Sequence, residues 1–125
     1  MGDVRSKSFP SDPQTASNAR HWVQEVVGDL DWDGEVDDAV LLVSELVTNA
    51  LLHAQAAVRV TLYRHDEGLW VSVTDGGAGR IVRRQAEPTD TIGRGLEIVD
   101  RMSGAWGVLT EPETKSVWFE LTAAR

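Results

Sequence analysis

The chain has 125 residues, of which 42% are hydrophobic, and its formal net charge is −8. This length fits a single domain with its own core, and the acidic balance argues against a nucleic-acid partner, which requires a basic face. The absence of cysteine excludes disulfides and thiolate metal sites and fits a reducing cytoplasm. No apolar run approaches the roughly 20 residues that span a bilayer, so we expect a cytoplasmic protein without a membrane partner.

The chain begins with a polar segment and continues with a helical pattern. Residues 1–13 contain two prolines and show no hydrophobic period, which predicts a flexible N-terminal arm before a single domain over residues 14–125. From Thr15 to about Asp29, apolar residues recur at the spacing of one helix face, and Thr15 or Ser17 is a suitable N-cap. The apolar positions are Ala19, Trp22, Val23, Val26, Val27 and Leu30.

A second helix is predicted from about Glu35 to Ala54. At about 100° per residue, its apolar residues form one face that must pack on the core. That face contains Val36, Ala39, Val40, Val43, Val47, Ala50 and Ala54. Leu41, Leu42 and Leu52 are expected on the opposite face, which is unusual for a helix side that should be solvated.

A row of polar residues along this helix is the first candidate site. Glu45, Asn49 and His53 recur at every fourth position, so they stack along one line. Flanked by leucines, they either line a half-buried pocket or form a polar seam on a surface helix. In a pocket, Glu45 could act as a general base, and the Asn49 carbonyl oxygen would suit Mg²⁺ held mainly by phosphates and water. His53 fits a packing or capping role better than a metal site.

Four strands and a third helix complete the predicted fold. Apolar residues alternate over residues 58–63 and again over 69–74, and the short connection between them predicts an antiparallel hairpin. A third helix is expected over residues 95–103, followed by strands over residues 106–110 and 116–122. Helices on one side of a mixed or antiparallel sheet make an α+β two-layer sandwich.

Asp75 is the second candidate site. It has the same strand parity as Val71 and Val73, so its side chain should point between the sheet and the helices. The glycines that follow, Gly76, Gly77 and Gly79, would let a flat ligand approach the backbone. An ionised carboxylate only accepts hydrogen bonds, so Asp75 would favour adenine, whose exocyclic amino group donates, over guanine. The alternative is an ordinary turn at the end of a strand.

A glycine-rich segment at the start of the third helix is a candidate anion site. Gly93, Arg94, Gly95 and Leu96 lead into the helix, where free backbone N–H groups can bind phosphate. The preceding residues 80–92 contain three arginines and could form a lid over phosphates. The alternative is a flexible loop that enters a helix.

Together these parts resemble the GHKL superfamily of ATP-binding domains, which gyrase, heat-shock chaperones, histidine kinases and mismatch-repair ATPases share. The matching segments are residues 44–50 (SELVTNA), 75–79 (DGGAG) and 93–96 (GRGL). The wording SELVTNALLHA and the short chain are most similar to bacterial anti-sigma factor serine/threonine kinases. The resemblance implies the Bergerat-type ATP-binding fold.

The resemblance also implies roles for individual residues. Glu45 would be the catalytic base, Asn49 would hold the Mg²⁺ that bridges the phosphates, and Asp75 would bind the adenine amino group. The remaining implied nucleotide contacts are Gly77, Gly79, Gly93, Arg94, Gly95 and Leu96. Arg20 matches an arginine that contacts the protein partner in anti-sigma kinases, although a solvated arginine is an equal alternative.

The implied function is a protein serine/threonine kinase that phosphorylates a small anti-sigma antagonist and sequesters a sigma factor, with ATP and Mg²⁺ as cofactors. A non-catalytic module that binds nucleotide and docks a partner is the alternative, and Glu45 favours the enzyme. Trp70 and Trp118 are expected on strand faces away from the predicted core, where they could contact a second copy of the chain in a homodimer. One departure from the family stands at Lys115 and Ser116, where the last strand often begins with a Gly-Thr pair near the base pocket.

Overall fold

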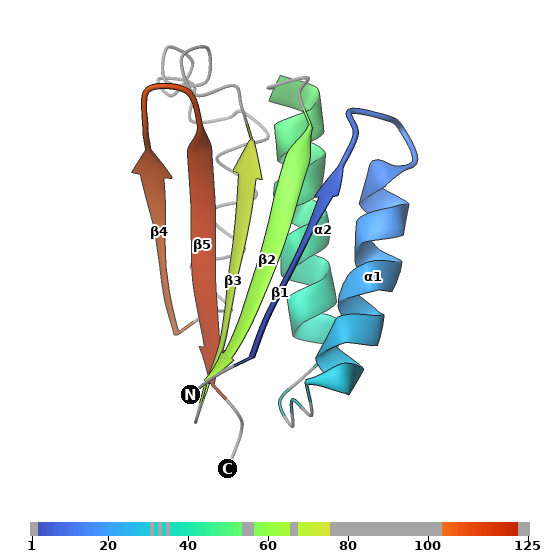
Figure 1. Ribbon diagram of the computed structural model, residues 1–125, viewed down its shortest axis with the longest axis vertical. Coiled ribbons are helices and arrows are strands. Elements are labelled where there is room, and N and C mark those ends of the chain that lie inside the picture. Colours follow the sequence, from blue (N-terminus) through green and yellow to red (C-terminus); the bar gives the residue numbers. More distant parts are fainter. Residues whose placement is uncertain are drawn as a thin grey trace.

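A five-stranded sheet with helices on one face forms the framework of the protein, as the computed structural model in Figure 1 shows. The structure describes residues 3–30, 32, 34, 36–53, 57–65, 68–75 and 104–122, and the side chain of His53 lies outside this set. Within these residues, two helices pack on the sheet and all strand pairs are antiparallel. This arrangement confirms the predicted α+β two-layer sandwich.

The described elements follow the predicted order closely. They are β1 (Asp3–Phe9), α1 (Thr15–Asp29), α2 (Val36–His53), β2 (Val58–His65), β3 (Gly68–Asp75), β4 (Ala105–Thr110) and β5 (Lys115–Thr122). The strand order in the sheet is β1-β2-β3-β5-β4. The third helix predicted over residues 95–103 lies outside the described residues. None of the described helices is long and apolar enough to cross a membrane.

The expected flexible arm was wrong over Asp3–Phe9, which form the edge strand β1 along β2. The side chains of Ser6 and Thr61 join the two strands by a hydrogen bond of 3.0 Å, and Arg59 donates to the Ser6 hydroxyl at 2.9 Å. The predicted cap at the start of α1, Thr15 or Ser17, was also wrong, because the N-cap is Gln14. The hydroxyl of Thr15 instead donates to the carbonyl oxygen of Pro10 at 2.6 Å. These three hydrogen bonds hold the N-terminal segment to the rest of the domain.

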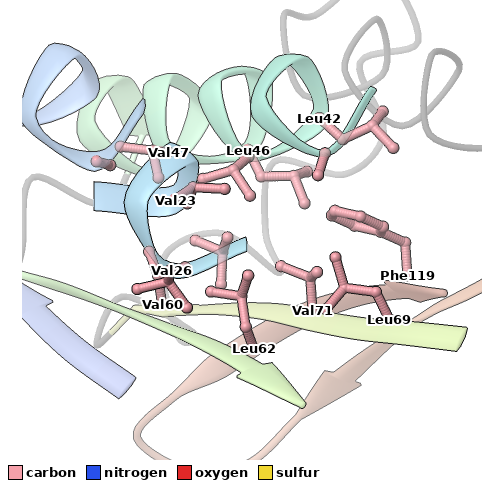
Figure 2. Packing of buried hydrophobic residues seen from close by; sticks show 14 of the residues in the cluster. Val23, Val26, Leu42, Leu46, Val47, Val60, Leu62, Leu69, Val71 and Phe119 are labelled. Carbon is pink, nitrogen blue, oxygen red and sulfur yellow. The ribbon is translucent and has the colours of Figure 1, made fainter. Parts of the chain in front are cut away.

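The core lies between the sheet and the helices and contains mainly valine and leucine (Figure 2). Leu41 and Leu52 of α2 are exposed, as predicted, but Leu42 is fully buried. The prediction for Leu42 was wrong because α2 packs against α1 as well as against β2 and β3. Because α2 packs on two sides, a larger part of its circumference is buried than the single apolar face that the periodicity indicated.

The opposite face of the sheet carries polar and aromatic side chains. Trp70 of β3 and Trp118 of β5 are both half-buried there, on the side away from the helices, as their strand parity predicted. The indole of Trp118 lies against Gly107 of β4, where an added Cβ would stand 2.8 Å from its Nε1. A glycine is therefore needed beneath this ring.

Candidate functional site

One end of the two-layer structure gathers the described candidate residues. In Figure 1, α2 and β3 both run toward this end, and β5 starts from it. Asn49 lies in the last turns of α2, Asp75 is the last residue of β3, and Lys115 is the first residue of β5. The packing of α2 against β3 therefore brings the helix row and the strand end into the same region of the molecule.

Glu45 and Asn49 occupy successive turns of α2. Glu45 is half-exposed, whereas Asn49 is only 7% exposed. The two residues therefore differ in what they can contact. The Glu45 carboxylate, at the boundary with solvent, can contact a protein substrate, whereas the buried Asn49 amide can contact a ligand bound inside the domain. The side chain of His53, the third member of the row, lies outside the described residues.

The side-chain amide of Asn49 has a carbonyl oxygen that can accept a hydrogen bond or bind a metal ion. Its Oδ1 is buried and accepts no hydrogen bond from any described residue. A buried carbonyl oxygen without a donor costs free energy unless a ligand or water satisfies it. Such a neutral oxygen fits Mg²⁺ that keeps waters and binds mainly to phosphates. In the described part of the chain, no group of three histidines or carboxylates could hold a metal by itself.

Asp75 lies where its strand parity predicted. It is 5% exposed on the helix-facing side of β3, at the end of the strand. Its neighbours in the sheet are Val58 of β2 and Lys115 of β5. A buried carboxylate requires a counter-charge or hydrogen-bond donors, and Lys115 supplies a positive charge directly across the strand pair.

Sequence reasoning missed Lys115 as a site residue, although the signal was present. Val117, Phe119 and Leu121 alternate along β5 and are buried, so Lys115 shares their helix-facing parity. On the other face of the same strand pair, the hydroxyls of Thr74 and Ser116 form a hydrogen bond of 2.7 Å. This bond holds the ends of β3 and β5 together next to Asp75 and Lys115.

The burial of Lys115 predicts a measurable pH dependence of stability. Burial lowers the pKa of this ammonium below its ordinary value of 10.5, and the charge of Asp75 opposes part of the change. The folded state thus binds the proton less readily than the unfolded chain, so at low pH the buried ammonium lowers the free energy of unfolding. This loss of stability disappears as the pH rises through the lowered pKa toward 10.5, because the folded state then releases the proton. We expect the wild type to gain stability relative to Lys115→Met as the pH rises toward that value from below.

Urea unfolding of both proteins at several pH values measures this difference. Lys7→Met is the matched control, because it removes the exposed lysine of β1. A difference between Lys115→Met and wild type that does not change with pH would contradict the burial of the ammonium.

Arg20 lies between the two helices. Its Nη1 donates to the hydroxyl of Ser44 at 3.2 Å, and the side chain is half-buried. Ser44 directly precedes Glu45, so the guanidinium is held beside the part of α2 that carries the candidate base. The remaining predicted contacts lie outside the described residues: Gly77, Gly79, Gly93, Arg94, Gly95 and Leu96.

Solved structures with this fold include the following two. The crystal structure of the RsbU and RsbW domains of Rv1364c from Mycobacterium tuberculosis matches 98% of this chain at 15% identity, with a TM-score of 0.71. The histidine kinase AdeS of Acinetobacter baumannii matches 98% of the chain at 11% identity, with a TM-score of 0.59. This chain spans 33% of the first of these chains and 70% of the second.

Sequence comparison gives the family. No curated protein matches the chain, but residues 9–121 match the family model described as "Histidine kinase-like ATPase domain". The match confirms the resemblance seen in the motifs, and an ATPase domain implies ATP binding. Because the matched residues cover most of the sequence, this chain belongs to the family of histidine kinase-like ATPase domains.

Proposed function

We propose that this protein is an ATP-dependent serine/threonine protein kinase that phosphorylates a small anti-sigma antagonist protein and sequesters a sigma factor. The observation that carries the proposal is the pair on α2: half-exposed Glu45 lies one turn from the buried acceptor oxygen of Asn49. Two further points support it. The wording SELVTNALLHA resembles anti-sigma kinases, and the fold is similar to a structure that contains an RsbW domain.

In this proposal, different residues would bind the base, the metal and the phosphates of ATP. Asp75 would accept a hydrogen bond from the adenine amino group, with Gly77 and Gly79 beside the base. Asn49 would offer its Oδ1 to Mg²⁺, which when bound neutralises charge on the phosphates. Gly93, Arg94, Gly95 and Leu96 would donate to the phosphates from the start of a helix. In this scheme the acidic chain holds a triphosphate through local donors, not through its net charge.

Glu45 would act on the protein substrate. A serine or threonine oxygen attacks the γ-phosphorus, the bond from that phosphorus to the β,γ-bridging oxygen breaks, and ADP leaves. The hydroxyl proton passes to the Glu45 carboxylate, which also orients the oxygen for in-line attack. A half-exposed position suits this role, because the substrate hydroxyl arrives from another protein.

The partner surface would lie on the helix layer. Arg20 is held against α2 through Ser44, so a protein docked at Arg20 would lie beside the helix that carries Glu45. This position could couple sigma-factor binding to the state of the nucleotide site. The same placement fits the alternative, a nucleotide-dependent binding module, and only turnover separates the two.

The direct test uses ATP labelled on the γ-phosphate, magnesium and candidate antagonist proteins. The kinase proposal predicts label on an antagonist serine or threonine, found by mass spectrometry. A pull-down from native extract with and without ATP should recover a sigma factor. Tight ATP binding without transfer to any antagonist that the pull-down identifies would favour the binding module and contradict the kinase.

Asp75→Asn should weaken ATP binding by about 100-fold, because the amide replaces an ionised acceptor and leaves the adenine amino group with a poorer partner. Thermal unfolding with added ATP measures the effect, since a ligand that binds only the folded state stabilises it more as the ratio of ligand concentration to Kd rises. Asp3→Asn is the matched control, because it neutralises an exposed carboxylate at the opposite end of the sheet. Equal ATP-induced shifts in wild type and Asp75→Asn would remove Asp75 from the site.

A further inference from the structure

Lys115 stands directly opposite Asp75 at the end of the sheet. The two residues are register partners in the antiparallel pair of β3 and β5, and both face the helix layer. Directly opposite residues in such a pair have Cβ atoms about 4.5–5.5 Å apart, so both side chains reach the same small region. On its other side, Lys115 pairs with Thr110 of β4.

The two side chains offer complementary hydrogen-bonding groups. A carboxylate only accepts, and an ammonium only donates. Placed side by side, they match an edge that presents a donor next to an acceptor. Adenine presents this edge: its 6-amino group donates and its neighbouring ring nitrogen N1 accepts. Guanine presents the reverse order, because its 6-oxygen accepts and its N1–H donates.

We propose that Lys115 is a second base-reading residue, whose ammonium donates to N1 of adenine while Asp75 accepts from the 6-amino group. This inference rests on the proposed binding of ATP at Asp75. It assigns a function to a residue that departs from the Gly-Thr pair often found at this position. The purine is then recognised at two adjacent atoms by two side chains of the same sheet end.

A purely structural ion pair is the competing explanation. Burial lowers the pKa of Lys115 and the charge of Asp75 opposes that change, so the two groups interact electrostatically. An ion pair alone would change stability when Lys115 is replaced, but it would not respond to a change at N1 of the base. The two explanations therefore differ in how affinity depends on the ligand.

The test compares ATP with 1-deaza-ATP, in which a C–H group replaces N1. Calorimetry on the wild-type protein should show about tenfold weaker binding of the analogue, the usual effect of losing a charge-assisted hydrogen bond. This comparison changes only the ligand, so it does not depend on whether a variant folds. Lys115→Met should bind ATP about tenfold more weakly than wild type and should not distinguish the two nucleotides.

Lys7→Met is the matched control, since it replaces the chain's other lysine, on the edge strand β1, and should keep the wild-type preference for ATP. If wild type and Lys115→Met both bound 1-deaza-ATP more weakly than ATP by the same factor, the proposal would be overturned, because another group would then contact N1. Equal affinity of wild type for both nucleotides would also overturn it. Failure of wild type to bind ATP at all would instead overturn the proposed function, and this inference with it.

Discussion

Replacing Glu45 with glutamine is expected to slow phosphoryl transfer to the antagonist by about 10²–10⁴-fold, the usual contribution of a positioned general base. The glutamine keeps the size and polarity of the side chain but cannot take up the hydroxyl proton. ATP affinity should change by no more than about twofold, because in the proposed site the nucleotide is held by other groups. The separation of these two effects is the signature of a residue that acts in the transfer step.

Single-turnover transfer of labelled phosphate measures the rate, and calorimetry measures ATP affinity for the same preparations. Glu25→Gln is the matched control, since it makes the same chemical change at an exposed position of α1. Its transfer rate should equal that of wild type. A Glu45→Gln protein that transfers phosphate at the wild-type rate would show that Glu45 is not the base.

Asn49 provides an internal comparison for the same experiment. The buried Oδ1 of Asn49 would bind the metal. Replacing Asn49 should therefore weaken ATP binding and reduce the dependence of that binding on magnesium, in contrast to replacing Glu45. In the proposed site, one helical turn would thus separate a residue that affects turnover from a residue that affects binding. The expected contrast follows from burial, because the half-exposed carboxylate of Glu45 would meet the protein substrate and the buried amide of Asn49 would meet the metal.

The elements that the sequence predicted well are those with a strong local period. The bounds of α1 match the structure, and α2 and the four predicted strands differ by only a few residues. Alternation also placed Asp75 on the correct face, because a strand residue's direction follows from that of its neighbours two positions away. Local patterns are enough where the core lies on one side of an element.

Strand β1 could not be predicted this way. Asp3, Arg5 and Lys7 share one face and Ser6 and Ser8 the other, so neither face is apolar. The strand is an edge strand, and its backbone pairing with β2 joins residues more than 45 positions apart. Leu42 was misjudged for a related reason: the packing of α1 against α2 decides its surroundings. Lys115 was missed although the alternation along β5 indicated its direction.

Replacing Phe119 with alanine is expected to cost about 3–5 kcal/mol of the free energy of unfolding. Phe119 heads the fully buried side chains in volume, and Figure 2 shows its ring beneath Leu42 of α2. Its register partners are Val71 in β3 and Trp106 in β4, so the ring fills the layer between the sheet and α2. A domain of this kind has about 5–15 kcal/mol in total, so much of the stability depends on one side chain.

Urea unfolding measures this loss, and Leu109→Ala on the neighbouring strand is the matched control. Leu109 is 54% exposed, so its truncation should change stability by no more than about 0.5 kcal/mol. ATP provides a second measurement, because a ligand at about 100 times its Kd adds about 2.7 kcal/mol to the folded state. If Phe119 supports the helix that carries Glu45 and Asn49 without touching the nucleotide, saturating ATP should restore part of the lost stability. A loss below about 1 kcal/mol would contradict the packing of α2 on the sheet through this ring.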